Sequence, residues 1–262
     1  MKASLLLLLG AFHVIAPGLA DGQTAPVAPA GRATVRANVS AEALFQAGAL
    51  AYKSGEYGAA SAAFRDAATT QPSSGSFQNL GLAEWQRGHP GLAILAWEQS
   101  LWLDSFNRAA HANLRFARKA AQVEAPDLAW YEVISSWLPM NWWAWTGVWS
   151  FWIAIAATFL PGIFRARKRG WHQAIAAASL TVLLLSIPAA FGVQSRSRLG
   201  FVLQKNCPLQ LTPTADSQVV TRLSAGDPVR LQRSRGAFCL VRTSRASGWI
   251  NRDQLGFLSQ KL

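Results

Sequence analysis

Two long apolar runs dominate the hydrophobic pattern of this chain. They cover residues 142–164 and 171–193, and His172 is their only ionisable side chain. As helices rising about 1.5 Å per residue, each would extend about 34 Å, enough to cross a hydrocarbon core of about 30 Å. Neither run has the polar stripe of an amphipathic helix, so protein or lipid must surround each on all sides. We therefore expect a transmembrane hairpin, with two core helices of a soluble protein as the alternative.

A short basic loop, residues 165–170, separates the two runs. Arg165, Arg167, Lys168 and Arg169 place four cations within five residues. Loops rich in Lys and Arg stay on the cytoplasmic side, so we expect a two-pass protein of the bacterial inner (cytoplasmic) membrane with its soluble domains in the periplasm. Two further cations, Arg196 and Arg198, follow the second run on the outer side, where positive charge is disfavoured. The four cations of the loop should outweigh them.

The N-terminus has the pattern of an export signal. In residues 1–20, Lys2 precedes a short apolar stretch, and Gly18, Leu19 and Ala20 precede the expected cleavage point. This favours a cleaved secretory signal peptide, with an uncleaved anchor as the alternative. Residues 21–40 are rich in Ala, Pro, Thr and Gly without an apolar period, which is typical of a flexible linker.

Residues 41–122 contain a repeat of 33 to 34 residues. Four pairs lie 33 positions apart: Gly48 and Gly81, Gly55 and Gly88, Ala60 and Ala93, and Phe64 and Trp97. The dipeptide Asn79-Leu80 then recurs 34 positions later as Asn113-Leu114. A fixed period of this size predicts a helical solenoid, in which each unit covers the apolar face of its neighbour.

The spacing of the small and aromatic positions resembles the tetratricopeptide repeat (TPR). In that family, ligands bind in the groove lined by the first helix of each unit. The resemblance therefore implies that Gln46, Tyr52, Lys53, Asn79, Leu82, Trp85, Asn113, Phe116 and Lys119 face a groove that binds a protein partner. Glu42, Gln46 and Ala109 stand where residues of a carboxylate clamp would be expected, so we do not expect such a clamp.

Residues 123–141 change from acidic to aromatic ahead of the first apolar run. Trp130, Tyr131 and Trp137 cluster there and continue into the tryptophans of the run itself. Because indole rings prefer the headgroup zone, we expect an interfacial linker with an aromatic belt, and a short surface helix is compatible with it. A sugar-binding site would also use tryptophan, but no clearly spaced pair of carboxylates accompanies these residues.

Residues 197–262 read as five or six short strands separated by turns. So many strands in so short a segment predict a small all-β barrel. The segments SAGDPVRLQ, RGAFCLVRT and SGWI resemble bacterial SH3-like domains, with Gly226, Gly248 and Trp249 at matching positions. Its candidate binding face comprises Arg230, Arg233, Arg235, Phe238 and Trp249. The acidic loop and tyrosines of eukaryotic SH3 domains are missing, so binding of proline-rich peptides is not expected.

Both cysteines of the chain, Cys207 and Cys239, fall in this predicted barrel. In an oxidising compartment an isolated pair is a candidate disulfide, although the sequence does not show whether their strands are neighbours. Two cysteines without a nearby histidine leave a tetrahedral zinc ion short of ligands, so no metal site is expected. We also expect no cofactor.

The net charge of +12 limits the possible functions. The excess lies in the basic loop and in residues 194–262, which suggests anionic partners; nucleic acid is not among the expected ones, because the export signals place this segment away from it. None of the four histidines accompanies a recognisable nucleophile motif, and no phosphate-binding or dinucleotide-binding glycine pattern is present. We therefore do not expect an enzyme.

The full order describes a multidomain membrane protein: an all-α TPR solenoid, a two-helix transmembrane hairpin and a small all-β SH3-like barrel. This order, with the runs AILAWEQSLWLDS and ANLRFARKAA, resembles the BatE-like family of bacterial aerotolerance (Bat) operons. The resemblance implies a scaffold that works with von Willebrand-type Bat proteins and a MoxR-like ATPase in envelope maturation or stress tolerance. The alternatives are a peptidoglycan-sensing or peptidoglycan-anchoring protein that uses the basic barrel, and an envelope enzyme with an unrecognised site.

Overall fold

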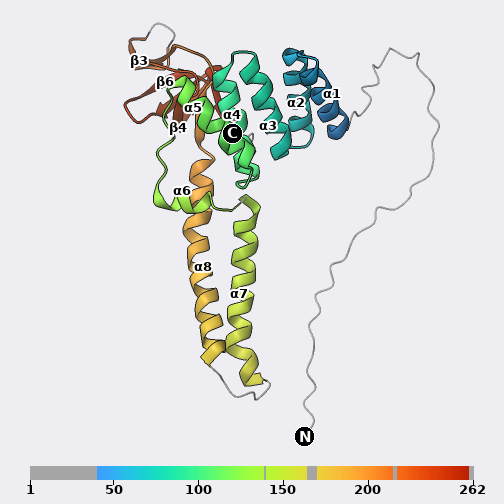
Figure 1. Cartoon of the computed structure of the whole chain (residues 1–262). Coiled ribbons are helices and arrows are strands. Elements are labelled where there is room, and N and C mark those ends of the chain that lie inside the picture. The colour runs from blue at the N-terminus through green and yellow to red at the C-terminus, as the bar shows by residue number, and fades with distance from the viewer. Residues whose placement is uncertain (1–39, 139, 164–169, 215–216, 260–262) are drawn as a thin grey trace, which may run out of the picture. The chain divides into compact units, whose positions relative to one another are not determined.

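The computed structural model of the chain describes residues 40–138, 140–163, 170–214 and 217–259 (Figure 1). The expected signal peptide, the linker up to residue 39 and the basic loop at 165–169 lie outside the described residues. Eight α-helices and one seven-stranded antiparallel sheet form the described part of the chain. The fold is therefore mixed, with helices preceding the sheet.

Five helices of similar length open the described chain: α1 (Ala41–Lys53), α2 (Tyr57–Thr70), α3 (Ser74–Gln86), α4 (Pro90–Leu103) and α5 (Arg108–Ala121). Each packs against the next one along the chain (Figure 1). The local sequence explains where they begin. Ser40, Ser73 and Asn107 cap α1, α3 and α5, each accepting a backbone N–H through its side chain, and Pro90 opens α4, where no N–H is needed.

The 33-residue period of the sequence is also present in the packing of these helices. A Cβ atom placed on Gly48 would come within 2.8 Å of the Phe64 ring, and one on Gly81 within 2.5 Å of the Trp97 indole. In each pair the glycine lies on the first helix and the ring on the second. Gly55 and Gly88 end the first helices with φ angles of +78° and +77°, a region that glycine adopts without strain. Two equivalent helical hairpins are thus built by equivalent residues.

Three further helices follow: α6 (Trp130–Ser135), α7 (Met140–Ile163) and α8 (Gly170–Arg196). Helices α7 and α8 lie side by side (Figure 1), and α6 packs on α8. Among the described helices, α8 alone is long and apolar enough to cross a membrane. Helix α7 is nearly as long and contains five tryptophans. Both helices differ slightly from the expected spans, and α8 continues to Arg196.

The sheet contains seven strands rather than the expected five or six: β1 (Leu199–Val202), β2 (Cys207–Gln210), β3 (Val219–Leu223), β4 (Pro228–Arg235), β5 (Phe238–Arg242), β6 (Ser247–Asn251) and β7 (Leu255–Phe257). Their order is β3-β2-β6-β5-β4-β1-β7, and every pairing is antiparallel. All seven strands contribute to one buried cluster, so the sheet curls around a single core. Within the described residues the hydrogen-bonded ladder ends at β3 and β7, so it is not closed as the predicted barrel would be.

The sheet packs directly against the helical repeat. Leu199, Phe201 and Leu258 belong to the same buried cluster as Trp97 of α4. The Gln99 side chain donates a hydrogen bond of 2.9 Å to the backbone carbonyl of Phe257. Gly91 lies so close to the sheet that a Cβ atom there would come within 2.5 Å of the Leu203 carbonyl oxygen. Helix α4 thus serves both the repeat core and the interface with the sheet.

Candidate functional site

The residues expected in the groove lie on α1, α3 and α5, but their exposure differs. On α1, Gln46 and Lys53 are exposed, and Gln46 donates a 2.7 Å hydrogen bond to Glu42 of its own helix. Tyr52 is half-buried and packs edge-on against Tyr57, with 5.3 Å between ring centroids. Tyr52 therefore supports its own hairpin.

The third and fifth helices contribute the remaining expected groove residues. Asn79, Leu82 and Asn113 are half-buried, and Lys119 is exposed. Leu82 packs against the main helical core. These side chains share the surface of α3 and α5 with Trp85 and Phe116.

The structure brings two of the expected groove residues together as an aromatic pair. Trp85 lies edge-on to Phe116, with ring centroids 5.5 Å apart, and also packs against Trp97 at 6.1 Å. Phe116 is 62% exposed. An exposed aromatic ring supported by a second, partly buried ring is typical of the anchor points of protein interfaces. Among the groove candidates, Trp85 and Phe116 are the best placed to contact a partner.

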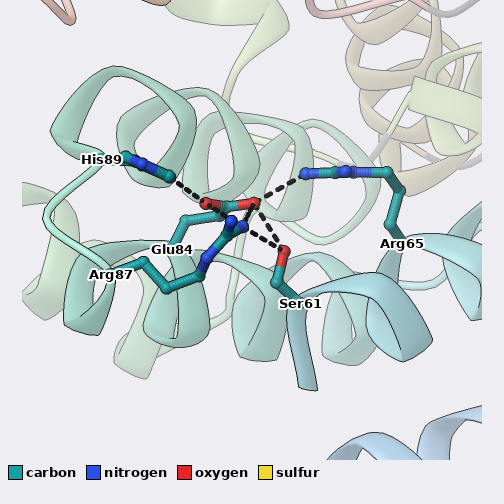
Figure 2. A network of polar contacts seen from close by, with 5 residues as sticks. All are labelled: Ser61, Arg65, Glu84, Arg87 and His89. Carbon is teal, nitrogen blue, oxygen red and sulfur yellow. Dashed lines mark hydrogen bonds and ion pairs between the residues drawn. The ribbon is translucent and has the colours of Figure 1, made fainter. Parts of the chain in front are cut away.

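A buried carboxylate that the sequence analysis did not identify lies between α2 and α3. Figure 2 shows Glu84 of α3 surrounded by four polar side chains. Its carboxylate is 1% exposed and accepts hydrogen bonds from Ser61 Oγ and Arg65 Nη2, each at 2.6 Å, and from Arg87 Nη1 at 3.1 Å. The remaining partner is His89 Nδ1, at 2.9 Å. Glu84 therefore ties α2 to the turn between α3 and α4.

The protonation of Glu84 favours a structural role over a catalytic one. Burial alone would raise its pKa, but the hydrogen bonds from Ser61 and His89 and the charges of Arg87 and Arg65 hold the pKa below its ordinary value. A carboxylate of that kind is a poor base near neutral pH. Ser61, which donates a hydrogen bond to this carboxylate, is fully buried, so no substrate can reach the Ser61 hydroxyl. The arrangement orders the repeat and does not activate a nucleophile.

Glu84 could have been found from its position in the repeat. It lies four residues after Leu80 and one after Ala83, both of which are buried. Residues four apart share one face of a helix. An acidic residue on the apolar face of α3 therefore indicated a buried carboxylate, and buried carboxylates need cationic or hydrogen-bonding partners.

Arg230, one of the residues of the predicted binding face, is already engaged within the protein. It is half-buried, and its guanidinium binds Glu132 of α6 through two contacts, Nη1 to Oε1 at 2.6 Å and Nη2 to Oε2 at 3.0 Å. It also donates to Ser195 Oγ at 3.0 Å and to the Asp127 carbonyl at 3.1 Å. The prediction for this residue was wrong because its partners come from segments 98 and 35 residues away in the chain.

Glu132 is the fully buried partner in this contact. Burial would raise its pKa, but the hydrogen bonds from Arg230, Ser195 and the Ala129 N–H bring the pKa below its ordinary value. The bond from Arg230 in turn raises the pKa of that guanidinium. We call this contact between Glu132 and Arg230 the clasp. It joins the segment ahead of α7 to strand β4.

The other residues of the predicted binding face remain available on the sheet. Arg233 and Arg235 are exposed, and Phe238 and Trp249 are half-buried. Phe238 is paired with Arg235 across β4 and β5, whereas Trp249 is paired with Leu240 across β5 and β6. The structure thus places two arginines and one aromatic ring near the β4–β5 turn, with Trp249 further along β6.

The candidate disulfide between Cys207 and Cys239 is not formed. Both residues are buried, free thiols in the core of the sheet. Strand β6 lies between their strands, β2 and β5, so the strands are about 9.5 Å apart, beyond the usual span of a disulfide. Burial raises the pKa of both thiols. They therefore behave as apolar core residues.

A cleft of about 460 Å³ lies between the segment after α5 and the sheet. Residues 122 and 124–127 form one wall. The other wall includes Arg222 at the end of β3 and Arg242 at the end of β5. Arg245, also in the wall, forms an exposed ion pair of 3.1 Å with Glu124. Hydroxyl groups and cations thus dominate the sheet side of the cleft.

A third buried carboxylate connects the repeat to the end of α8. Glu98 of α4 forms an ion pair with Arg118 of α5. Burial raises the pKa of Glu98, although Arg118, Arg196 and His111 oppose this rise. The Arg196 guanidinium also stacks over the Trp102 ring, 5.2 Å from its centroid. Arg196, which disagreed with the charge pattern expected on the outer side of a membrane, is therefore used inside the protein.

No known family model, curated protein or solved structure matches this chain. In the part of the chain that the structure describes, no group of three His, Cys, Asp or Glu side chains is arranged to hold a metal ion. The site must therefore be interpreted from its own residues. These comprise the aromatic pair on the repeat, the cleft beside the sheet and the apolar helix pair.

Proposed function

We propose that this chain is a two-pass membrane protein that acts as a non-enzymatic adaptor. In this proposal α7 and α8 cross the bilayer, and the helical repeat and the sheet form one head on the same side. The head offers two surfaces to partners, the Trp85–Phe116 pair and the sheet. Such a protein recruits or positions other proteins at the membrane.

The observation that carries the proposal is the distribution of side chains on the helix pair. Small and polar residues face inward: Ser179, Ser186, Ala189 and Gly192 of α8 are buried, and Gly147 of α7 lies against Ser186. Large apolar residues face outward on both helices, as for Trp145, Trp149, Phe159, Ile175, Leu184, Ile187 and Phe191. Soluble helix pairs have the opposite arrangement, whereas helices in lipid pack through small residues.

The contacts at one end of the helix pair support a single head. Gly192 of α8 lies directly against the Tyr131 carbonyl of α6, and the clasp continues from α6 to β4. The repeat meets the sheet through α4. Because α8 runs into β1 after two residues, the sheet has little freedom to leave this end of the helix pair.

The resemblance to BatE-like proteins extends this proposal to a cellular setting. It makes the head periplasmic and the membrane the bacterial inner membrane. It also suggests von Willebrand-type Bat proteins and a MoxR-like ATPase system as partners in envelope maturation or stress tolerance. The charge of the loop at 165–169 supports this orientation.

Topology reporters test the proposal. A reporter that is active only outside the cytoplasm, fused after Leu262, should be active in the unmodified chain. Replacing Arg165, Arg167, Lys168 and Arg169 by neutral residues should lower that activity, because these cations hold the loop in the cytoplasm. As a matched control, neutral residues in place of Arg233 and Arg235 should leave it unchanged. A Leu262 fusion that is inactive outside in the unmodified chain would refute the shared-side topology.

A cell-wall function is the alternative that the cleft beside the sheet keeps open. If the purified chain is retained on isolated peptidoglycan, and Arg222→Ala with Arg242→Ala releases it, the sheet is a wall-binding module and the adaptor proposal fails for that surface. Retention that is lost instead in Trp85→Ala with Phe116→Ala would point to protein carried with the wall preparation. The two variants therefore separate the two functions.

A further inference from the structure

The two edges of the sheet are treated differently by the rest of the molecule. Strand β7, at one edge, is covered by α4: Gln99 donates to the Phe257 carbonyl at 2.9 Å, and Leu95 lies against Gly256. An uncovered edge strand presents unpaired N–H and C=O groups that can pair with another chain, and proteins usually cover or interrupt such edges. This chain covers the β7 edge with both a side-chain hydrogen bond and an apolar contact.

Within the described residues, strand β3 at the other edge has no such cover, although a register shift at Leu209 and Gln210 interrupts its pairing with β2. Its only ladder partner among the described strands is β2. Val219 and Val220 are 41% and 46% exposed, and Leu211 beside them is also exposed. β-branched residues on an open edge favour the addition of a further strand.

The pairing with β2 shows which backbone groups of β3 point outward. Arg222 lies opposite Pro208, which has no N–H to donate. This pair therefore cannot exchange two hydrogen bonds, so it is a non-hydrogen-bonded pair of the ladder. In such a pair the N–H and C=O groups point away from the partner strand. The N–H and C=O of Arg222 are thus directed to the open side of β3.

Positive charge lies at the end of this edge. Arg222 and Arg242 line the cleft of about 460 Å³ that begins at the last residues of β3, and both are exposed. Among the described residues, neither has an ion pair with a carboxylate, whereas Arg230 and Arg245 in the same cleft pair with Glu132 and Glu124. Arg222 donates a hydrogen bond of 3.5 Å to the Asn206 carbonyl. Because neither arginine has a carboxylate partner among the described residues, the two are complementary to acidic side chains.

We infer that β3 is a docking edge for an extended acidic segment of a partner protein, which adds to the sheet as an eighth strand. Its backbone pairs with β3 at Arg222, its apolar side chains cover the two exposed valines, and its carboxylates lie against Arg222 and Arg242. A second copy of this chain is a poorer occupant. Residues 194–262 carry eleven Lys and Arg against three Asp, a net charge of +8, so two such domains repel each other.

This inference rests on the proposed adaptor function and names the partner of the sheet. It is tested by direct binding to the full chain in lipid nanodiscs. The probe is a fluorescent peptide of about seven residues with alternating Glu and Val, long enough to cover one strand. Two matched peptides serve as controls. In one, Lys replaces Glu; in the other, alternate backbone nitrogens of the Glu–Val peptide are methylated, which removes strand pairing and keeps the charge.

The Glu–Val peptide should bind, and the methylated peptide should bind at least about tenfold more weakly, because the backbone bonds are lost. Arg222→Ala with Arg242→Ala should weaken binding about fivefold to tenfold and reduce its dependence on salt. The matched variant Arg233→Ala with Arg235→Ala removes two exposed arginines outside the cleft and should bind as the unmodified chain does.

Three results would overturn the inference. The first is equal binding of the methylated and unmethylated Glu–Val peptides. The second is no binding of the Glu–Val peptide at about 1 mM, a concentration at which even a weak specific site would be occupied. The third is a dimer of the chain that the Val220→Lys substitution dissociates. The last result would assign β3 to a second copy. Failure of the adaptor proposal is distinguishable, because it appears in the topology reporters and leaves the peptide measurements unaffected.

Discussion

Individual buried carboxylates in this protein join segments that are far apart in the chain. Glu84 holds α2 against α3, Glu98 holds α4 against α5, and Glu132 holds α6 against β4. Each is paired with at least one arginine. Removing one partner of such a pair leaves an uncompensated charge in a buried place, which costs more than the pair itself contributes.

Replacement of Glu84 by Gln should destabilise the repeat by about 2 kcal/mol. The single neutral oxygen of Gln cannot satisfy two guanidinium groups, and its buried NH2 group would face other hydrogen-bond donors. Arg65 is half-exposed, so solvent weakens its share of the loss. Hydrogen exchange of the α2 and α3 amides in the full chain measures this change. Glu56→Gln, at an exposed carboxylate beside α2, should leave the exchange unaltered. Equal effects of both variants would contradict the role given to Glu84.

The same carboxylate predicts a dependence on acid. Because the folded pKa of Glu84 lies below its ordinary value of 4.5, its contribution to stability is present above pH 4.5. The contribution is lost as the pH falls through the lower, folded pKa. In the Glu84→Gln variant, the hydrogen exchange of the α2 and α3 amides should no longer show this loss of stability as the pH falls.

The exposure of a side chain could be predicted from sequence where its surroundings come from its own helix or strand, and could not be predicted where they come from distant segments. The exposed positions of Lys53, Arg233 and Arg235 follow from charged side chains on ordinary helix and strand surfaces. The burial of Arg230 could not be predicted, since its partners Glu132 and Ser195 come from other elements. A lone cation in a strand gives no signal of a distant carboxylate.

At the scale of elements, close helix packing is set by glycines opposite aromatic rings. Gly81 faces Trp97 so closely that a methyl group would overlap the indole. The residue types needed for this contact leave a fixed spacing in the sequence, so the helical repeat could be predicted from its period. The short β7 could not, because three residues carry no periodic pattern and depend on α4 for their cover.

Gly81→Ala should destabilise the repeat by about 1–3 kcal/mol, because the new methyl group displaces the Trp97 ring from a packed core. Gly58→Ala is the matched control: Gly58 lies in α2 with open space around its Cα. That variant should be neutral or up to about 1 kcal/mol more stable, since alanine favours helix. Thermal unfolding followed by the near-ultraviolet signal of the tryptophans compares the two. A neutral Gly81→Ala would show that the helices do not approach as closely as described.

For the whole molecule, the clasp, the α4 interface and the end of α8 make the repeat and the sheet one head. This coupling was not predictable from sequence, because it depends on complementary surfaces brought together only in the folded chain. The order of the segments along the chain could nevertheless be anticipated, since each has its own local pattern. The clasp is the contact to test most directly, because it connects the sheet to the segment that precedes α7.

Glu132→Gln should release α6 and the preceding residues 124–129 from β4. The substitution removes one charge from a buried ion pair that is joined by two hydrogen bonds. After a discount for the partial exposure of Arg230, the expected loss of stability is about 2 kcal/mol, which corresponds to about 30-fold faster hydrogen exchange in α6. Glu124→Gln is the control, because its ion pair with Arg245 is 65% and 81% exposed and should matter little. The folded pKa of Glu132 is lowered, so the clasp should persist until the pH falls below 4.5. Unchanged exchange in Glu132→Gln, or equal acceleration in Glu124→Gln, would mean that apolar contacts alone hold the head together.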